Sequence, residues 1–201
     1  MTTHLSRIKY DVIVEPLAGQ LVSGDDYFIK EYDDFILFAV VDGLGHGEDA
    51  AIAAKKAIQT LDSNAHEPLE NLIALCDQAL LDTRGAAMTL GKIDYRNILS
   101  YVAAGNVAGV CWKRDGHARL IHESFHLDNG IVGSRLSKKI LVKKIALSVG
   151  DMIILATDGI RSTFGIHTPL LEPLEKMSKR IFDNYRNKND DGLVLIMQLL
   201  S

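Results

Sequence analysis

The chain has 201 residues, of which 47% are hydrophobic and 24% charged, and its formal net charge is -4 at pH 7. These values are typical of a soluble globular protein and exclude a disordered or fibrous chain. The net negative charge, without any long stripe of Lys and Arg, argues against nucleic acid as a partner. The length suits one ordinary domain, and no repeat or Pro/Ser-rich linker divides it, so we predict a single domain over residues 1–201.

The N-terminus and the cysteines indicate the cellular compartment in which the protein is expected. No charged leader is followed by an apolar segment, and no apolar run approaches the ~18 residues that a membrane span needs. We therefore expect a cytoplasmic protein without a membrane partner. Cys76 and Cys111 lie in apolar runs without CxxC spacing. They are predicted to be small core residues without redox or zinc chemistry.

In the first third of the chain, strands are expected to precede helices. The segment 10–16 is rich in β-formers, and 34–41 is a nearly continuous apolar run, which predicts a strand buried on both faces. Three glycines in the segment Asp-Gly-Leu-Gly-His-Gly, residues 42–47, end that strand. The helical spacing of apolar residues, with acidic residues in the first turn, then predicts two helices. They span residues 48–61 and 68–85.

The rest of the chain is expected to be β-rich, because turn residues separate short runs of β-formers. The predicted strands span residues 86–93, 98–103, 107–112, 118–122, 139–145, 152–157 and 193–199. Residues 128–137 are predicted to form a loop, and a third helix is expected at about 170–185. Sequential hairpins, with helices grouped rather than alternating one for one with strands, favour antiparallel sheets with helices outside, an α+β fold.

Aspartates recur at the predicted strand ends. Asp42 and Asp158 each follow a buried strand and precede a glycine, Asp25 precedes a short apolar run, and Asp190 or Asp191 precedes the last strand. Burying a carboxylate costs free energy unless a partner offsets it. Converging carboxylates would therefore need cations, and Mg²⁺ or Mn²⁺ prefer such oxygen ligands. Asp-Gly is also a common turn dipeptide, so turn geometry stays the alternative for any single aspartate.

The order of these motifs resembles that of the PPM-type metal-dependent serine/threonine protein phosphatases. The matching segments are Ser23-Gly-Asp25, Val41-Asp-Gly-Leu-Gly-His-Gly47, Arg84-Gly-Ala-Ala-Met-Thr89, Ala104-Gly-Asn-Val107, Ala156-Thr-Asp-Gly159 and Asp190-Asp191. The version Asp-Gly-Leu-Gly-His-Gly is similar to that of the bacterial SpoIIE/RsbU branch. A stand-alone domain of this length resembles the feedback phosphatases of the stressosome.

This resemblance implies a four-layer α-β-β-α sandwich, in which two antiparallel sheets are flanked by helix pairs, with a metal cleft at one edge. It implies two Mn²⁺ or Mg²⁺ ions. Asp42 would bridge them, the Gly43 carbonyl and Asp25 (through water) would serve the first, and Asp158 and Asp190 the second. These four aspartates are the expected catalytic residues, and the implied reaction is attack of metal-activated water on phosphoserine or phosphothreonine.

The resemblance also implies partners. The expected substrates are phosphorylated STAS-domain regulatory proteins of a stressosome-like complex, and we expect a monomer. Two positions depart from the family pattern. Leu193 stands where many relatives carry a hydroxyl residue, which bears on the support around the ligands. The phosphate-binding Arg of eukaryotic members has no counterpart, because Gln20 occupies that neighbourhood.

Other functions stay open on the residues alone. One is a phosphatase-like scaffold that binds regulatory partners without turnover. Another is a nucleotide-binding regulator, but the dinucleotide fingerprint needs a glycine where Glu48 stands. His46 is expected to structure its loop rather than to act as a general acid. The other three histidines of interest form no metal-ligand pattern: His117, His122 and His126.

Overall fold

The computed structural model describes residues 6–114, 120–128, 130–137, 139–166 and 172–200. Within these residues, ten strands form two five-stranded sheets, with the orders β1-β10-β9-β6-β7 and β2-β3-β4-β5-β8. Every strand pair is antiparallel. The strands are β1 (Ile8–Glu15), β2 (Asp25–Glu31), β3 (Phe35–Gly43), β4 (Ala86–Asp94), β5 (Ile98–Ala104), β6 (Ala108–Arg114), β7 (Leu120–Ser124), β8 (Lys143–Ala146), β9 (Met152–Ala156) and β10 (Gly192–Leu199).

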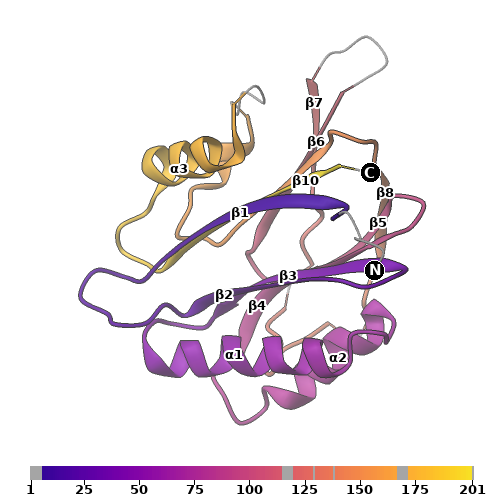
Figure 1. Cartoon of the computed structure of the whole chain (residues 1–201). Coiled ribbons are helices and arrows are strands. Elements are labelled where there is room, and N and C mark those ends of the chain that lie inside the picture. Colours follow the sequence, from indigo (N-terminus) through magenta and orange to yellow (C-terminus); the bar gives the residue numbers. More distant parts are fainter. Residues whose placement is uncertain (1–5, 115–119, 129, 138, 167–171, 201) are drawn as a thin grey trace, which may run out of the picture.

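The two sheets pack face to face, and helices cover their outer faces (Figure 1). Helices α1 (Glu48–Ser63) and α2 (Leu69–Ala79) lie on the sheet that contains β3, and α3 (Leu174–Tyr185) lies against β1 and β10. The predicted four-layer α+β sandwich is confirmed. A helix pair was expected on each side, but the described residues beyond β9 hold only α3 and a short 3-10 helix, η1 (Ser162–Ile166).

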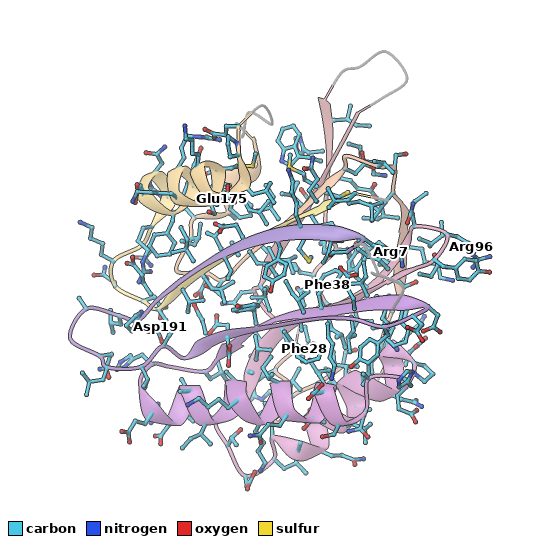
Figure 2. The ribbon with its side chains drawn as sticks, in the orientation of Figure 1. Arg7, Phe28, Phe38, Arg96, Glu175 and Asp191 are labelled. Carbon is cyan, nitrogen blue, oxygen red and sulfur yellow. The ribbon has the colours of Figure 1, made fainter. Side chains whose placement is uncertain are left out.

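Strand β3 is buried on both faces because it lies between the helices and the other sheet, as the apolar run predicts. Leu37 belongs to the core cluster under α1 and α2, and Phe38 to the cluster between the sheets. Figure 2 shows the same division, with Phe28 toward α1 and Phe38 between the layers. Fully burying one such side chain contributes roughly 1.5–3 kcal/mol, so these alternating faces hold the sandwich together.

Three predicted elements are shorter than the sequence suggested. Helix α2 ends at Ala79, because a turn in which the Thr83 amide donates to the Leu80 carbonyl replaces its last turns. Helix α3 begins at Leu174, because Pro173 occupies its N-cap and lacks an N–H group; residues 170 and 171 lie outside the described residues. Strand β8 covers only 143–146, the residues that pair with β5.

Strand β2 was not predicted, because only a short apolar run was noted after Asp25. The remaining strands agree with prediction to within a few residues. Strand β3 continues through Asp42 and Gly43, and β7 begins at Leu120, since residues 118 and 119 lie outside the described residues. Strand β1 pairs along its whole length with β10. The first and last strands of the chain are therefore neighbours in one sheet. No helix in the described ranges is long and apolar enough to cross a membrane.

Both cysteines are buried and free, as predicted. Burial raises the pKa of the Cys76 thiol to about 12, and it does the same for Cys111. Both thiols are therefore neutral near pH 7, and a neutral thiol is a poor nucleophile and metal ligand.

Candidate metal and catalytic site

Four aspartates from both sheets meet at one edge of the sandwich. Asp25 begins β2 and is the register partner of Asp42 on β3. Directly opposed residues on antiparallel strands have Cβ atoms about 4.5–5.5 Å apart, so these two carboxylates are neighbours. Asp158 follows β9 and Asp190 precedes β10, which pairs with β9 in the other sheet. The structure thus brings these four residues together at one edge, where the family resemblance implied a cleft.

Thr157 links the two sheets inside this cluster. Asp25 is only 5% exposed, and its Oδ2 accepts a hydrogen bond of 2.7 Å from the Thr157 hydroxyl. The same hydroxyl oxygen accepts a 2.9 Å hydrogen bond from the backbone amide of Leu193. Thr157 is itself buried, so its hydroxyl is held between a donor on β10 and an acceptor on β2. This contact fixes the orientation of the Asp25 carboxylate.

Asp190 and Asp191 have different surroundings. The Asp191 carboxylate is 3% exposed and accepts two backbone hydrogen bonds, from Leu17 at 2.6 Å and Gly24 at 2.8 Å. It therefore fastens the loop between β1 and β2 to the start of β10; Figure 2 labels it at this end of the strands. Asp190 is half-buried, and the raised pKa of Asp158 is caused first by burial and then by the charge of Asp190. Its Oδ1 accepts a hydrogen bond only from the adjacent Asp191 amide within the described residues.

Two polar side chains that sequence reasoning missed support this edge. The Asn106 amide donates a 2.5 Å hydrogen bond to Oδ2 of Asp158. The Arg186 guanidinium donates to the backbone carbonyls of Gly159, Asp190 and Asp191. Asn106 lies in a family motif, which was a signal for it. No sequence signal pointed to Arg186, because it binds backbone carbonyls, and these do not depend on which side chains the sequence carries.

The glycine after each strand-end aspartate is required by close packing. A Cβ on Gly43 would lie 2.1 Å from the carbonyl oxygen of Ala50 in α1. A Cβ on Gly159 would lie 1.6 Å from the carbonyl oxygen of Asp191. Any side chain at either position would push the helix or the neighbouring loop away. The Asp-Gly pairs are therefore more than turn signals, since they allow these chain segments to approach closely.

Burial and mutual repulsion raise the pKa values of the clustered carboxyls. Burial raises the pKa of Asp42 to about 8, and the charges of Asp25, Asp158 and Asp190 add to this. Burial also raises the pKa of Asp25 to about 7, against the opposing effect of the Thr157 hydrogen bond. The pKa of Asp158 is raised by partial burial and by Asp190. Such a cluster holds protons near neutral pH unless cations replace them.

The donor set fits a hydrated hard cation. In the described residues, no three His, Cys, Asp or Glu side chains surround one point closely enough to hold a metal ion unaided. Mg²⁺ keeps several water ligands and is usually bound through one or two carboxylates, so such a cage is not needed. The groups at this edge are oxygen donors, which favour Mg²⁺ or Mn²⁺ over zinc.

The loop that follows Asp42 is not stabilised by His46. His46 is exposed and makes no hydrogen bond within the described part of the chain, so its predicted structural role finds no support. Instead the Leu44 amide donates to the Gly85 carbonyl at 3.0 Å, and Arg84 forms an ion pair of 2.6 Å with Asp49 in the first turn of α1.

Two of the three other histidines noted in the sequence lie within the described residues. His122 is on β7, with its ring 5.1 Å from that of Trp112, and Nε2 of His126 lies 3.4 Å from Oδ1 of Asp128. His117 lies outside the described residues. Neither described histidine belongs to the aspartate cluster.

The nucleotide-binding alternative loses its structural basis. A dinucleotide loop joins a strand and a helix in a unit of parallel strands. Here β3 pairs with β2 and β4, and both pairs are antiparallel. The segment 43–47 therefore connects the strand and helix of a different architecture.

The two antiparallel sheets, the outer helices and the aspartate cluster at their common edge define a PPM-type phosphatase domain, the class that the sequence predicts. A family model, described as Stage II sporulation protein E (SpoIIE), matches residues 33–199. The chain therefore belongs to the SpoIIE family.

Comparison with individual proteins agrees with this family assignment. The chain is 26% identical over 199 residues to the phosphoserine phosphatase RsbX of Bacillus subtilis (strain 168), covering 98% of this chain and 96% of RsbX. A chain solved in work on the bacterial stressosome, described as a modular system adapted to control secondary messenger signalling, matches with a TM-score of 0.86 and 26% identity over 96% of this chain and all of that one. A crystal structure of RsbX in complex with magnesium matches with a TM-score of 0.80 and 23% identity, covering 96% and 95% of the two chains. The predicted resemblance to stressosome phosphatases is confirmed.

Proposed function

We propose that this protein is a metal-dependent phosphoserine/phosphothreonine phosphatase that acts on phosphorylated proteins of a stressosome-like complex. The observation that carries the proposal is the meeting of Asp25, Asp42, Asp158 and Asp190 at one edge of a SpoIIE-family fold. The full-length similarity to a phosphoserine phosphatase, RsbX, and to a stressosome chain supports this substrate class.

We propose two metal ions, Mg²⁺ or Mn²⁺, held by the clustered carboxylates. Asp42 is assigned as the bridging ligand. The negative charges of Asp25, Asp158 and Asp190 each raise its pKa, so all three carboxylates lie near it. The Gly43 carbonyl and Asp25, through water, would serve one ion, and Asp158 with Asp190 the other. The magnesium bound in the RsbX crystal supports the choice of metal. Bound ions of this kind activate water for attack on phosphorus and neutralise charge on the transferring phosphoryl group.

Asp190 is preferred to Asp191 as the ligand. Both oxygens of Asp191 already accept backbone hydrogen bonds, from Leu17 and Gly24. The Asp190 carboxylate instead lies within electrostatic reach of Asp158. Asp191 then has a structural role.

The other residues of the site position these ligands. Asn106 orients Asp158 through its amide, and Thr157 orients Asp25 through its hydroxyl. Arg186 ties the turn after Asp158 to the turn before β10 by donating to carbonyls on both. Such supporting contacts typically change metal affinity or activity about 10- to 100-fold when removed.

The proposed substrates are phosphorylated STAS-domain regulatory proteins, which would place the enzyme in the cytoplasm. A test is mass spectrometry of such a phosphoprotein incubated with the protein and Mn²⁺, beside an unrelated phosphoprotein at equal concentration. Faster loss of phosphate from the STAS-domain protein is expected. Equal rates on both would contradict this substrate assignment while leaving the phosphatase activity itself intact.

The catalytic claim is tested with a small phosphoester such as para-nitrophenyl phosphate. Wild type with Mn²⁺ or Mg²⁺ should hydrolyse it, and Asp42→Asn and Asp158→Asn should not. Asp62→Asn is a matched control, because this exposed aspartate forms an ion pair with Lys30 on the surface and lies away from the aspartate cluster. A wild type that shows neither hydrolysis nor a metal-dependent rise in melting temperature would instead support the alternative of a non-catalytic scaffold.

A further inference from the structure

A groove of about 380 Å³ lies beside the aspartate cluster, between β6, β7 and η1. Ala108 and Val110 of β6 form one wall, Ser124 of β7 another, and Ser162 and Phe164 of η1 a third. None of the clustered aspartates lines it. It is therefore a separate feature of the surface that the metal site does not use.

Two chain paths lead directly from the metal site to this groove. Asn106, whose amide holds Asp158, is two residues before Ala108. Ser162 is four residues after Asp158. An extended chain advances about 3.3 Å per residue, so the near wall lies within roughly 7 Å of Asn106 along the strand.

The groove suits an uncharged, apolar group. Val110 and Phe164 belong to the buried core cluster beneath α3, and they make two of the groove's walls apolar. Ser124, Ser162 and His122 are exposed and form a polar rim. No Asp, Glu, Lys or Arg is among the described residues that line it. A charged side chain entering it would lose hydration without gaining a partner.

We propose that this groove binds an apolar side chain of the phosphoprotein substrate, two to four residues from the phosphoserine. The inference rests on the proposed function, and it adds a specificity site to the metal centre. The separation follows from reach, because two to four residues of extended peptide span about 7–13 Å. A volume of about 380 Å³ accommodates a leucine or phenylalanine side chain.

A second groove of similar size does not meet this requirement. It has a volume of about 410 Å³ and is lined by residues such as Phe35 and Lys92. Phe35 begins β3, whereas Asp42 is near its far end, so this groove lies at the opposite end of the strand from the metal site. A residue adjacent to the reacting phosphoserine does not reach it.

The first test uses nonapeptides of alanine and glycine with a central phosphoserine, in which one leucine is moved through every position. With wild type and Mn²⁺, leucine at one position two to four residues from the phosphoserine should raise kcat/KM by about tenfold or more over alanine. Aspartate at that position should give no increase. A kcat/KM that does not depend on the position of leucine would overturn the inference.

The second test fills the groove, with Ser124→Trp and Ala108→Leu from two different walls. The readout is the ratio of kcat/KM for the preferred leucine peptide to that for the alanine peptide, measured within each variant, so it does not depend on overall activity. Both variants should lower the ratio to within about twofold of one, which is the loss of the discrimination expected for one apolar side chain.

Ile121→Trp is the matched control, because Ile121 is exposed on β7 and alternates to the face opposite Ser124. It should keep the wild-type ratio. An unchanged ratio in both filled variants would overturn the groove assignment. Absence of metal-dependent hydrolysis of every peptide and of para-nitrophenyl phosphate would instead overturn the proposed function, and this inference with it.

Discussion

The hydroxyl of Thr157 donates a 2.7 Å hydrogen bond to Asp25, which joins the two sheets at the aspartate cluster. The same oxygen accepts the Leu193 amide at 2.9 Å. Leu193 departs from the family pattern in lacking a hydroxyl, but its side chain is buried in the core between the sheets. Because Thr157 supplies a hydroxyl next to Asp25, the departure leaves this carboxylate with a hydrogen-bond donor.

Replacing Thr157 by valine should therefore affect both stability and metal affinity. Valine keeps the shape, but it leaves the Leu193 amide without an acceptor and Asp25 without a donor. The free energy of unfolding should fall by about 1–3 kcal/mol, the cost of leaving a buried polar group unpaired. Urea denaturation measures this, and titration calorimetry with Mn²⁺ measures the weaker metal binding.

Thr157→Ser is the control for that change, because serine keeps the hydroxyl and loses only a methyl group. Serine should restore Mn²⁺ affinity to near the wild-type value. If valine and serine have equal affinity for Mn²⁺, Thr157 does not position Asp25.

Asp42→Asn should abolish phosphatase activity and yet stabilise the metal-free protein. The Asp42 carboxyl is partly buried beside three other carboxyls, and burial raises its pKa to about 8. Asparagine removes this charge, so at pH 8.5 the melting temperature without metal should rise, by an amount equivalent to about 0.5–2 kcal/mol. In differential scanning fluorimetry, Mn²⁺ should raise the melting temperature of wild type and have little effect on the variant. A lower melting temperature of the metal-free variant would contradict this account.

The hydrophobic pattern was sufficient to predict the α+β class, whereas the four-layer arrangement followed only from the family resemblance. The unbroken apolar run of 34–41 indicated a strand covered on both faces, and the structure places β3 between the helices and the second sheet. Element ends were less predictable, because they depend on local contacts. Helix α2 ends at Ala79 through a turn with Thr83, and β8 stops where its pairing with β5 stops.

The positions of the clustered aspartates were also predictable, because each lies next to an apolar segment where a strand begins or ends. Their supporting residues were not. Arg186 acts on backbone carbonyls, and Thr157 acts across sheets on Asp25, which is 132 positions away in the sequence. Neither contact produces a local spacing. The roles of Asp190 and Asp191 were equally open, since only the structure shows which carboxylate accepts backbone amides.

The stability of the metal-free protein should fall as the pH rises from 5 to 8.5. Burial raises the pKa of Asp25 to about 7 and that of Asp42 to about 8. The pKa of an aspartate in an unfolded chain is about 3.9. The folded state therefore holds more protons than the unfolded state between these values. Its stability is greatest below the unfolded pKa and is lost as the pH rises through the folded pKa.

The free energy of unfolding of the metal-free protein should fall by at most about 1.4 kcal/mol per pH unit for each of Asp25 and Asp42. Mn²⁺ or Mg²⁺ replaces the protons, so the rise in melting temperature on adding metal should be larger at pH 8.5 than at pH 6. Melting curves with EDTA and with metal, recorded in one series of buffers, measure both effects. A metal-free stability that rises with pH over this range would contradict the raised pKa values.

Asp190→Asn and Asp191→Asn should separate catalysis from structure. Asparagine at 190 still accepts the Asp191 amide through its side-chain oxygen, so stability should change by no more than about 0.5 kcal/mol, while activity with Mn²⁺ is lost.

Asparagine at 191 accepts only one of the amides of Leu17 and Gly24 and turns its NH₂ group toward the other. The free energy of unfolding should fall by about 1–3 kcal/mol. Because the loop that Asp191 fastens leads directly into Asp25, activity should fall in part and recover as Mn²⁺ is increased. An Asp191→Asn protein with wild-type stability and no activity at any Mn²⁺ concentration would reverse the two assignments.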